Sequence, residues 1–106
     1  MGARIIFSQM SNVQLQGHIR RIAQFSERVY FLDHARLRMK ERRVNDMQVL
    51  ECLRQGLVQR PPQRFKTGEV RVRMDHYGSA RNLSVTVSLD EQDPDLLVVT
   101  VMIQTR

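Results

Sequence analysis

Three polar residues with a shared spacing, His34, Arg38 and Arg42, have side chains that can bind and process a phosphate ester. Residues i, i+4 and i+8 of an α-helix lie on one face, so the three side chains form a single stripe. Arginine presents a planar fork of donors that matches phosphate oxygens, and histidine changes its charge near neutral pH. The spacing predicts a phosphate-binding helix surface with an acid–base group at one end. The alternative is a solvated face on which the arginines pair with nearby carboxylates.

A second group of candidate residues follows later in the chain. Metal-independent cleavage of RNA needs a base for the 2′-hydroxyl proton, an acid for the leaving oxygen and cations around the phosphate. We expect His34 to act with His76 and Tyr77, provided that helix-on-sheet packing brings them together. The structural alternatives are that His34 bonds a backbone carbonyl and that His76 and Tyr77 are an exposed pair at a turn. The candidates for nucleic-acid binding are Arg38, Arg42, Arg43, Arg71 and Arg73.

Other kinds of site are not indicated by the sequence. It has no Gly-rich phosphate loop, no histidine pair at metal-ligand spacing and no nucleophile elbow. Cys52 is the only cysteine, which excludes an intramolecular disulfide and a Cys-based zinc site, and we expect it to be a buried helix residue. We therefore expect no metal and no cofactor, and a structural role for His18.

Length and charge bound the class of protein. A chain of 106 residues with 42% hydrophobic content fits one domain with a real core, and we expect a loose tail over 1–12 followed by a single domain over 13–106. Residues 1–66 hold 13 basic and 5 acidic residues (+8), and residues 67–106 hold 4 and 6 (−2). The resulting net charge of +6 favours RNA or another polyanion as partner. The first ten residues contain only three consecutive apolar positions, which predicts a cytoplasmic protein without membrane contact.

Hydrophobic periodicity divides the chain into helices followed by strands. A period near 3.6 predicts three helices. The first covers 13–28, the second runs from an N-cap at Asp33 to about Arg43, and the third runs from an N-cap at Asn45 to Gly56. In the last of these, Gln48 completes a capping box, and Met47, Leu50, Leu53 and Leu57 are the expected buried stripe. Residues 29–32 are either a brief strand or more helix, and 59–68 should be a basic loop. A period of two then predicts three strands, with turns at Gly78 and at Asp93-Pro94.

These elements define an α+β fold. The first two strands alternate apolar and polar residues, which is typical of an antiparallel sheet with helices on a single side. The last strand is apolar on both faces and should be central or covered on both sides. We expect N-terminal helices packed on one face of a three- to four-stranded antiparallel sheet.

The pattern His-Ala-x-x-Arg-Met-x-x-Arg-x-Val, formed by His34, Ala35, Arg38, Met39, Arg42 and Val44, resembles a known family. This is a family of small bacterial and phage proteins of unknown function, grouped with the RelE-like and colicin-like ribonuclease toxins of the BECR type. The resemblance covers about residues 30–103. It implies helices on a curved antiparallel sheet and RNA cleavage or RNA binding. One departure is that the last strand carries no titratable residue, where such toxins often place a catalytic one.

Two functional hypotheses follow. The first is a toxin-like RNA-processing protein, a metal-independent ribonuclease in which His34, His76 and Tyr77 act on a phosphate held by Arg38 and Arg42. The second is a non-catalytic accessory module of a phage or mobile element that binds nucleic acid or a host protein through the Arg-rich helix face. An antitoxin is the protein partner that the first hypothesis implies.

Overall fold

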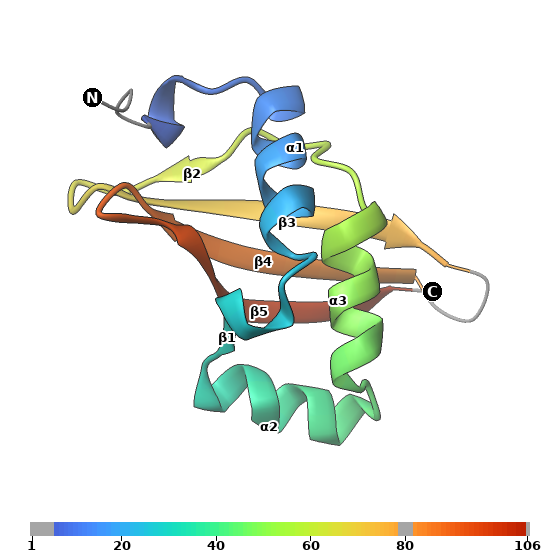
Figure 1. Cartoon of the computed structure of the whole chain (residues 1–106). Coiled ribbons are helices and arrows are strands. Elements are labelled where there is room, and N and C mark those ends of the chain that lie inside the picture. Colours follow the sequence, from blue (N-terminus) through green and yellow to red (C-terminus); the bar gives the residue numbers. More distant parts are fainter. Residues whose placement is uncertain (1–5, 79–81, 106) are drawn as a thin grey trace.

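The computed structural model describes residues 6–78 and 82–105, with side chains up to Thr100. Its fold class is α+β, as predicted, with the helices preceding most of the strands (Figure 1). The elements in chain order are η1 (Phe7–Gln9), α1 (Asn12–Ile22), η2 (Ser26–Arg28), β1 (Val29–Phe31), α2 (Asp33–Arg42), α3 (Asp46–Gln55), β2 (Gln63–Arg64), β3 (Glu69–Tyr77), β4 (Asn82–Asp90) and β5 (Asp93–Thr105).

The sheet is larger than expected and is mixed. Five strands lie in the order β1-β5-β4-β3-β2, with β1 parallel to β5 and the other pairs antiparallel. The expectation of three to four antiparallel strands is wrong on this point because β1 and β2 have only three and two residues, too few for a periodic signal. β2 lies inside the predicted loop. β5 is an interior strand, as its apolar sequence indicated, with β1 and β4 on either side, whereas the middle strand of the five is β4.

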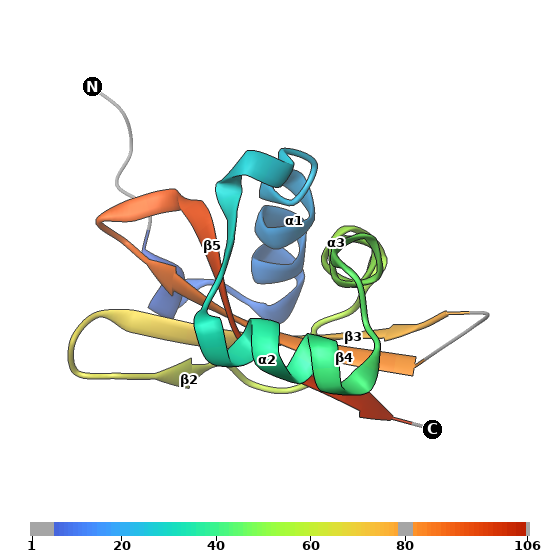
Figure 2. The same ribbon diagram turned by 90° about the horizontal axis from the view of Figure 1, so that it is seen from below.

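The two faces of the sheet have different surroundings. Helices α1 and α3 lie on one side of the strands, and α2 runs along the edge of β5 beyond the short β1 (Figure 2). The apolar side chains of β3 and β4 face α1 and α3 and form the core with them. The opposite side, which we call the open face, carries the alternate residues. Its members include Glu69, Arg71, Arg73, Asp75 and Tyr77 of β3, Ser84, Thr86 and Ser88 of β4, and Leu96, Val98 and Thr100 of β5.

Helix α3 begins and ends where the sequence predicted. The Asn45 side chain accepts from the Gln48 backbone N–H, and the Gln48 side chain accepts from the Asn45 backbone N–H, so the capping box is complete. The helix ends at Gly56, where a Cβ would lie 2.4 Å from the Cys52 carbonyl oxygen, so that only glycine fits this close approach.

The buried stripe of α3 differs from the expected one. Leu50 and Leu53 are buried as predicted, but Met47 is 64% exposed and Leu57 is 42% exposed. Val49 and Cys52 are buried beside the two leucines. Met47 lies in the first turn of α3, and Leu57 lies beyond its end, where its backbone pairs with Asp75 of β3 while its side chain stays partly exposed.

Three other boundaries differ from the expectation. The first helix ends at Ile22 rather than Arg28, because the chain turns through an extended Phe25 into β1. Asp33 is the first residue of α2, and the cap position is Leu32, which makes no side-chain cap bond. Residues 6–12 are not a loose tail, because the Phe7 ring is fully buried against His18 of α1; residues 1–5 lie outside the described part. No helix in the described part is long and apolar enough to cross a membrane.

Candidate nucleic-acid interface

Helix α2 presents its predicted polar stripe beside the open face. Ala35 and Met39 are buried in the core, which fixes how the helix is turned against β5. On one flank, His34 Nε2 lies 2.7 Å from the Thr100 carbonyl oxygen of β5. On the other flank, Arg36 lies over the Phe31 ring and pairs with Asp46 of α3. His34 therefore lies at the edge of β5, on the flank of α2 opposite Arg36, which faces α3.

The arginines of the stripe follow His34 toward the end of α2. Arg38 and Arg42 come one and two turns after it and are both exposed. Arg43 is the C-cap residue in the left-handed conformation, with φ 56°, and is also exposed. The last turn of a helix favours cations because the carbonyl ends carry partial negative charge. Helix geometry thus supports the basic residues at this end.

The His34 contact has a chemical consequence. A carbonyl oxygen only accepts hydrogen bonds, so Nε2 of His34 carries the hydrogen and donates it to Thr100. In the neutral ring the lone pair is then on Nδ1, the atom that would accept a proton. The sequence analysis gave this bond to a backbone carbonyl as the structural alternative to a catalytic role for His34. The same bond leaves Nδ1 as the nitrogen that could act as a base.

A cross-strand row joins His34 to a strand arginine. Thr100 Oγ1 donates to the Thr86 carbonyl oxygen at 3.2 Å, and Thr86 is paired with Arg73 in the register of β3 and β4. His34, Thr100, Thr86 and Arg73 therefore follow one another across three strands. His34 and Arg73, which were separate candidates in the sequence analysis, lie at the two ends of this row.

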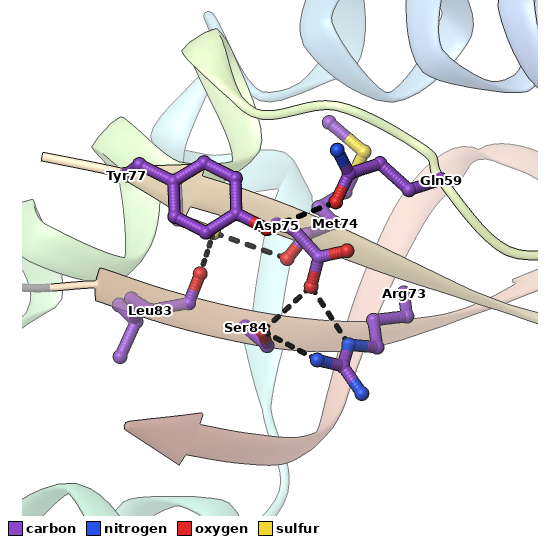
Figure 3. A network of polar contacts seen from close by, with 8 residues as sticks. Gln59, Arg73, Met74, Asp75, Tyr77, Leu83 and Ser84 are labelled. Atoms are coloured by element: carbon purple, nitrogen blue, oxygen red, sulfur yellow. Dashed lines mark hydrogen bonds and ion pairs between the residues drawn. The ribbon is translucent and has the colours of Figure 1, made fainter. Parts of the chain in front are cut away.

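The guanidinium of Arg73 is held in place by two residues that the sequence analysis missed (Figure 3). Asp75 Oδ1 accepts from Arg73 Nε at 2.7 Å and from Ser84 Oγ at 2.6 Å, while Arg73 Nη2 lies 3.1 Å from Ser84 Oγ. The Asp75 side chain is only 5% exposed, so its charge needs these partners. The sequence signal was an Arg-x-Asp spacing, which places both residues on one face of a strand.

A pocket of about 390 Å³ lies next to Arg71 on the open face. Its lining includes Leu96, Val98 and Asp90. Arg71 itself pairs with Glu69 at 2.9 Å and lies over a Phe65 ring in the β2–β3 connection. The carboxylates of Glu69 and Asp90 make this pocket an unfavourable place for a phosphate.

The structure does not bring the predicted catalytic residues together. His76 lies on the helix-covered face, where its Nε2 is 3.1 Å from Glu51 Oε1 of α3. His34 lies at the edge of β5, so β4 and β5 separate the two histidines. Tyr77 lies on the open face and donates its hydroxyl to Gln59 Oε1 at 3.1 Å. The expected site of His34, His76 and Tyr77 fails because alternation along β3 puts His76 and Tyr77 on opposite faces.

The remaining candidate groups are structural. His18 is buried, donates from Nε2 to the Pro94 carbonyl at 2.7 Å, and accepts from Arg21 at Nδ1. Burial lowers the pKa of His18, and the nearby Arg21 charge adds to this effect. Burial raises the pKa of the Cys52 thiol to about 12, as fits a core residue. Within the described ranges, no cluster of three or more His, Cys, Asp or Glu residues could hold a metal.

Comparison with known proteins gives a family and no relative of known activity. Residues 31–103 match DUF4258, a domain of unknown function. No curated protein and no solved structure matches the chain. The matched range begins at the end of β1, and it includes α2, α3, β3, β4 and β5 up to residue 103.

Proposed function

The chain belongs to the DUF4258 family, and from this premise we propose that it binds RNA across the open face and the adjoining flank of α2. The row from His34 to Arg73 is the observation that carries the proposal. It gives a continuous polar path across the sheet with basic groups at both ends. The net charge of +6 and the resemblance to ribonuclease toxins favour RNA as the polyanion.

In this proposal the arginines contact phosphates. Arg38 and Arg42 lie along the helix flank, and Arg73 lies on the strand side of the path. Each arginine that neutralises a phosphate releases counterions, so affinity should fall steeply as salt increases. Such contacts position the nucleic acid without reading its sequence.

The test is a fluorescence-anisotropy titration of a labelled single-stranded RNA over a series of salt concentrations. For single strands each phosphate contact contributes about 0.7 to the slope of log affinity against log salt. Changing Arg38→Gln and Arg42→Gln together should lower the slope by about 1.4 and weaken binding at low salt.

The matched control removes the same charge from the opposite side. Arg21 and Arg28 lie on α1 and η2, so the double variant Arg21→Gln, Arg28→Gln should keep the wild-type slope. Equal slopes for all three proteins would contradict the proposal and support the view that the stripe is only a solvated face.

A second candidate function, metal-independent RNA cleavage, is favoured by the orientation of His34. With its hydrogen on Nε2, the neutral ring would take the 2′-hydroxyl proton at Nδ1, while Arg38 would hold the phosphate. The 2′-oxygen would bond to phosphorus as the P–O5′ bond breaks, and the leaving 5′-oxygen would take a proton from water. RNA incubated in EDTA with the wild type and with His34→Ala, then run on a denaturing gel, tests this step. Cleavage by the wild type alone would support it, and intact RNA with both proteins would leave binding as the function.

A further inference from the structure

We infer that Tyr77 and Arg73 form a subsite for an unpaired nucleotide of RNA, with a base stacked on the Tyr77 ring and a phosphate bound by the Arg73 guanidinium. This inference rests on the proposed function and names the form of RNA that the open face binds. The subsite lies at the end of the open face away from the pocket beside Arg71.

Tyr77 has the properties of a stacking surface. Its side chain is among the most exposed large hydrophobic groups of the described part, at 62%. Its hydroxyl donates to the exposed Gln59 side chain, and this contact limits the positions of the ring. A ring that is restricted before binding loses less conformational entropy when a base stacks on it.

Arg73 lies on the same face of β3, with Asp75 between it and Tyr77. Asp75 and Ser84 engage Nε and Nη2, and Nη1 takes no part in those contacts (Figure 3). The side chain is 27% exposed, so the guanidinium reaches the surface while its other edge is buried against Asp75. An arginine oriented in this way binds a phosphate by directed hydrogen bonds rather than as a mobile point charge.

The geometry favours a single strand over a duplex. Positions 73 and 77 lie on one strand face and are separated by roughly 13 Å, so one strand could place a phosphate and a base at the two positions. Stacking on an aromatic side chain requires a base that is not already stacked in a helix. In a duplex, the base would first have to be extruded, which costs a few kcal/mol.

Tyrosine fluorescence tests the stacking directly. The chain has no tryptophan and two tyrosines, Tyr77 and Tyr30, so Tyr30→Phe leaves Tyr77 as the sole fluorophore of its kind. Adding unlabelled single-stranded RNA to this variant should quench the emission and saturate at the concentration at which anisotropy saturates. The mirror variant Tyr77→Phe retains Tyr30 of β1, and its emission should not change.

Affinity measurements complete the test. Tyr77→Ala should weaken single-strand binding about five- to a hundredfold and leave duplex binding unchanged, whereas Tyr77→Phe keeps the ring and should stay within about threefold. RNA that binds by anisotropy without quenching Tyr77, and equally well to Tyr77→Ala, would overturn the subsite and leave the proposed function standing. No anisotropy change with any RNA would overturn the proposed function itself.

Discussion

At the residue scale, two histidines make the same contact in different surroundings. His18 and His34 each donate from Nε2 to a carbonyl oxygen at 2.7 Å. The second nitrogen distinguishes them, because Nδ1 of His18 accepts from Arg21 in the core, whereas His34 lies on an exposed helix flank. A histidine–carbonyl bond therefore does not distinguish a structural role from a chemical one. The surroundings of the other ring nitrogen distinguish the two roles.

The buried His18 predicts a pH dependence of stability. Its pKa is lowered by burial in the folded protein, so below about pH 6.5 the unfolded chain binds the proton more readily. The stabilisation is present above that pH and is lost as the pH falls toward the folded pKa. In urea titrations at several pH values, the free energy of unfolding of the wild type should fall as the pH falls below about 6.5. The fall should be smaller in His18→Gln, by up to about 1.4 kcal/mol per pH unit. His34→Gln is the control, and an equal decline in both variants would contradict the assignment.

The buried carboxylate of Asp75 predicts a coupling between stability and binding. Asp75→Asn keeps the shape but removes the charge that orients Arg73, so the free energy of unfolding should fall by about 1–3 kcal/mol. Affinity for single-stranded RNA should fall as well, because Arg73 loses its fixed orientation. Ser84→Ala removes one weaker partner and should cost about 1 kcal/mol. If Asp75→Asn bound RNA as the wild type does, Arg73 would not need this support.

At the element scale, the features that could be predicted from the sequence are those that depend on neighbouring residues along the chain. The bounds of α3 follow from Asn45 and Gln48, and the interior place of β5 follows from its apolar run. The parallel pairing of β1 with β5 joins Val29 to Leu97, and no local signal marks a contact at that separation. The Asp75 cluster was missed for the same reason, since Ser84 reaches Asp75 only through strand pairing.

The capping box of α3 predicts a stability effect confined to one position. Asn45→Ala leaves the Gln48 backbone N–H without its acceptor and should lower the free energy of unfolding by about 1 kcal/mol in urea titration. Asn45→Ser retains a capping oxygen and should lie within a few tenths of a kcal/mol of the wild type. The same loss in both variants would indicate that packing, rather than the cap, holds the start of α3.

At the scale of the whole molecule, structure and proposed function are divided between the faces of one sheet. The helix-covered face buries the apolar side chains of β3, β4 and β5, while the open face carries charged and hydroxyl groups held by each other. Substitutions on the open face can therefore change binding while the apolar core stays intact. This separation is what makes the RNA-binding tests on Arg38, Arg42 and Tyr77 interpretable.

The single cysteine offers a probe of how the whole domain opens. Cys52 lies between α3 and the sheet, with Sγ 3.4 Å from the Met74 carbonyl oxygen, and its side chain is fully buried. Burial raises the pKa of this thiol to about 12, so little of the reactive thiolate is present in the folded protein at pH 8. A thiol reagent such as DTNB should therefore label the native protein only through unfolding. The free energy from labelling rates should equal that from urea titration, and a clearly smaller value would show that α3 detaches from the sheet while the remaining fold persists.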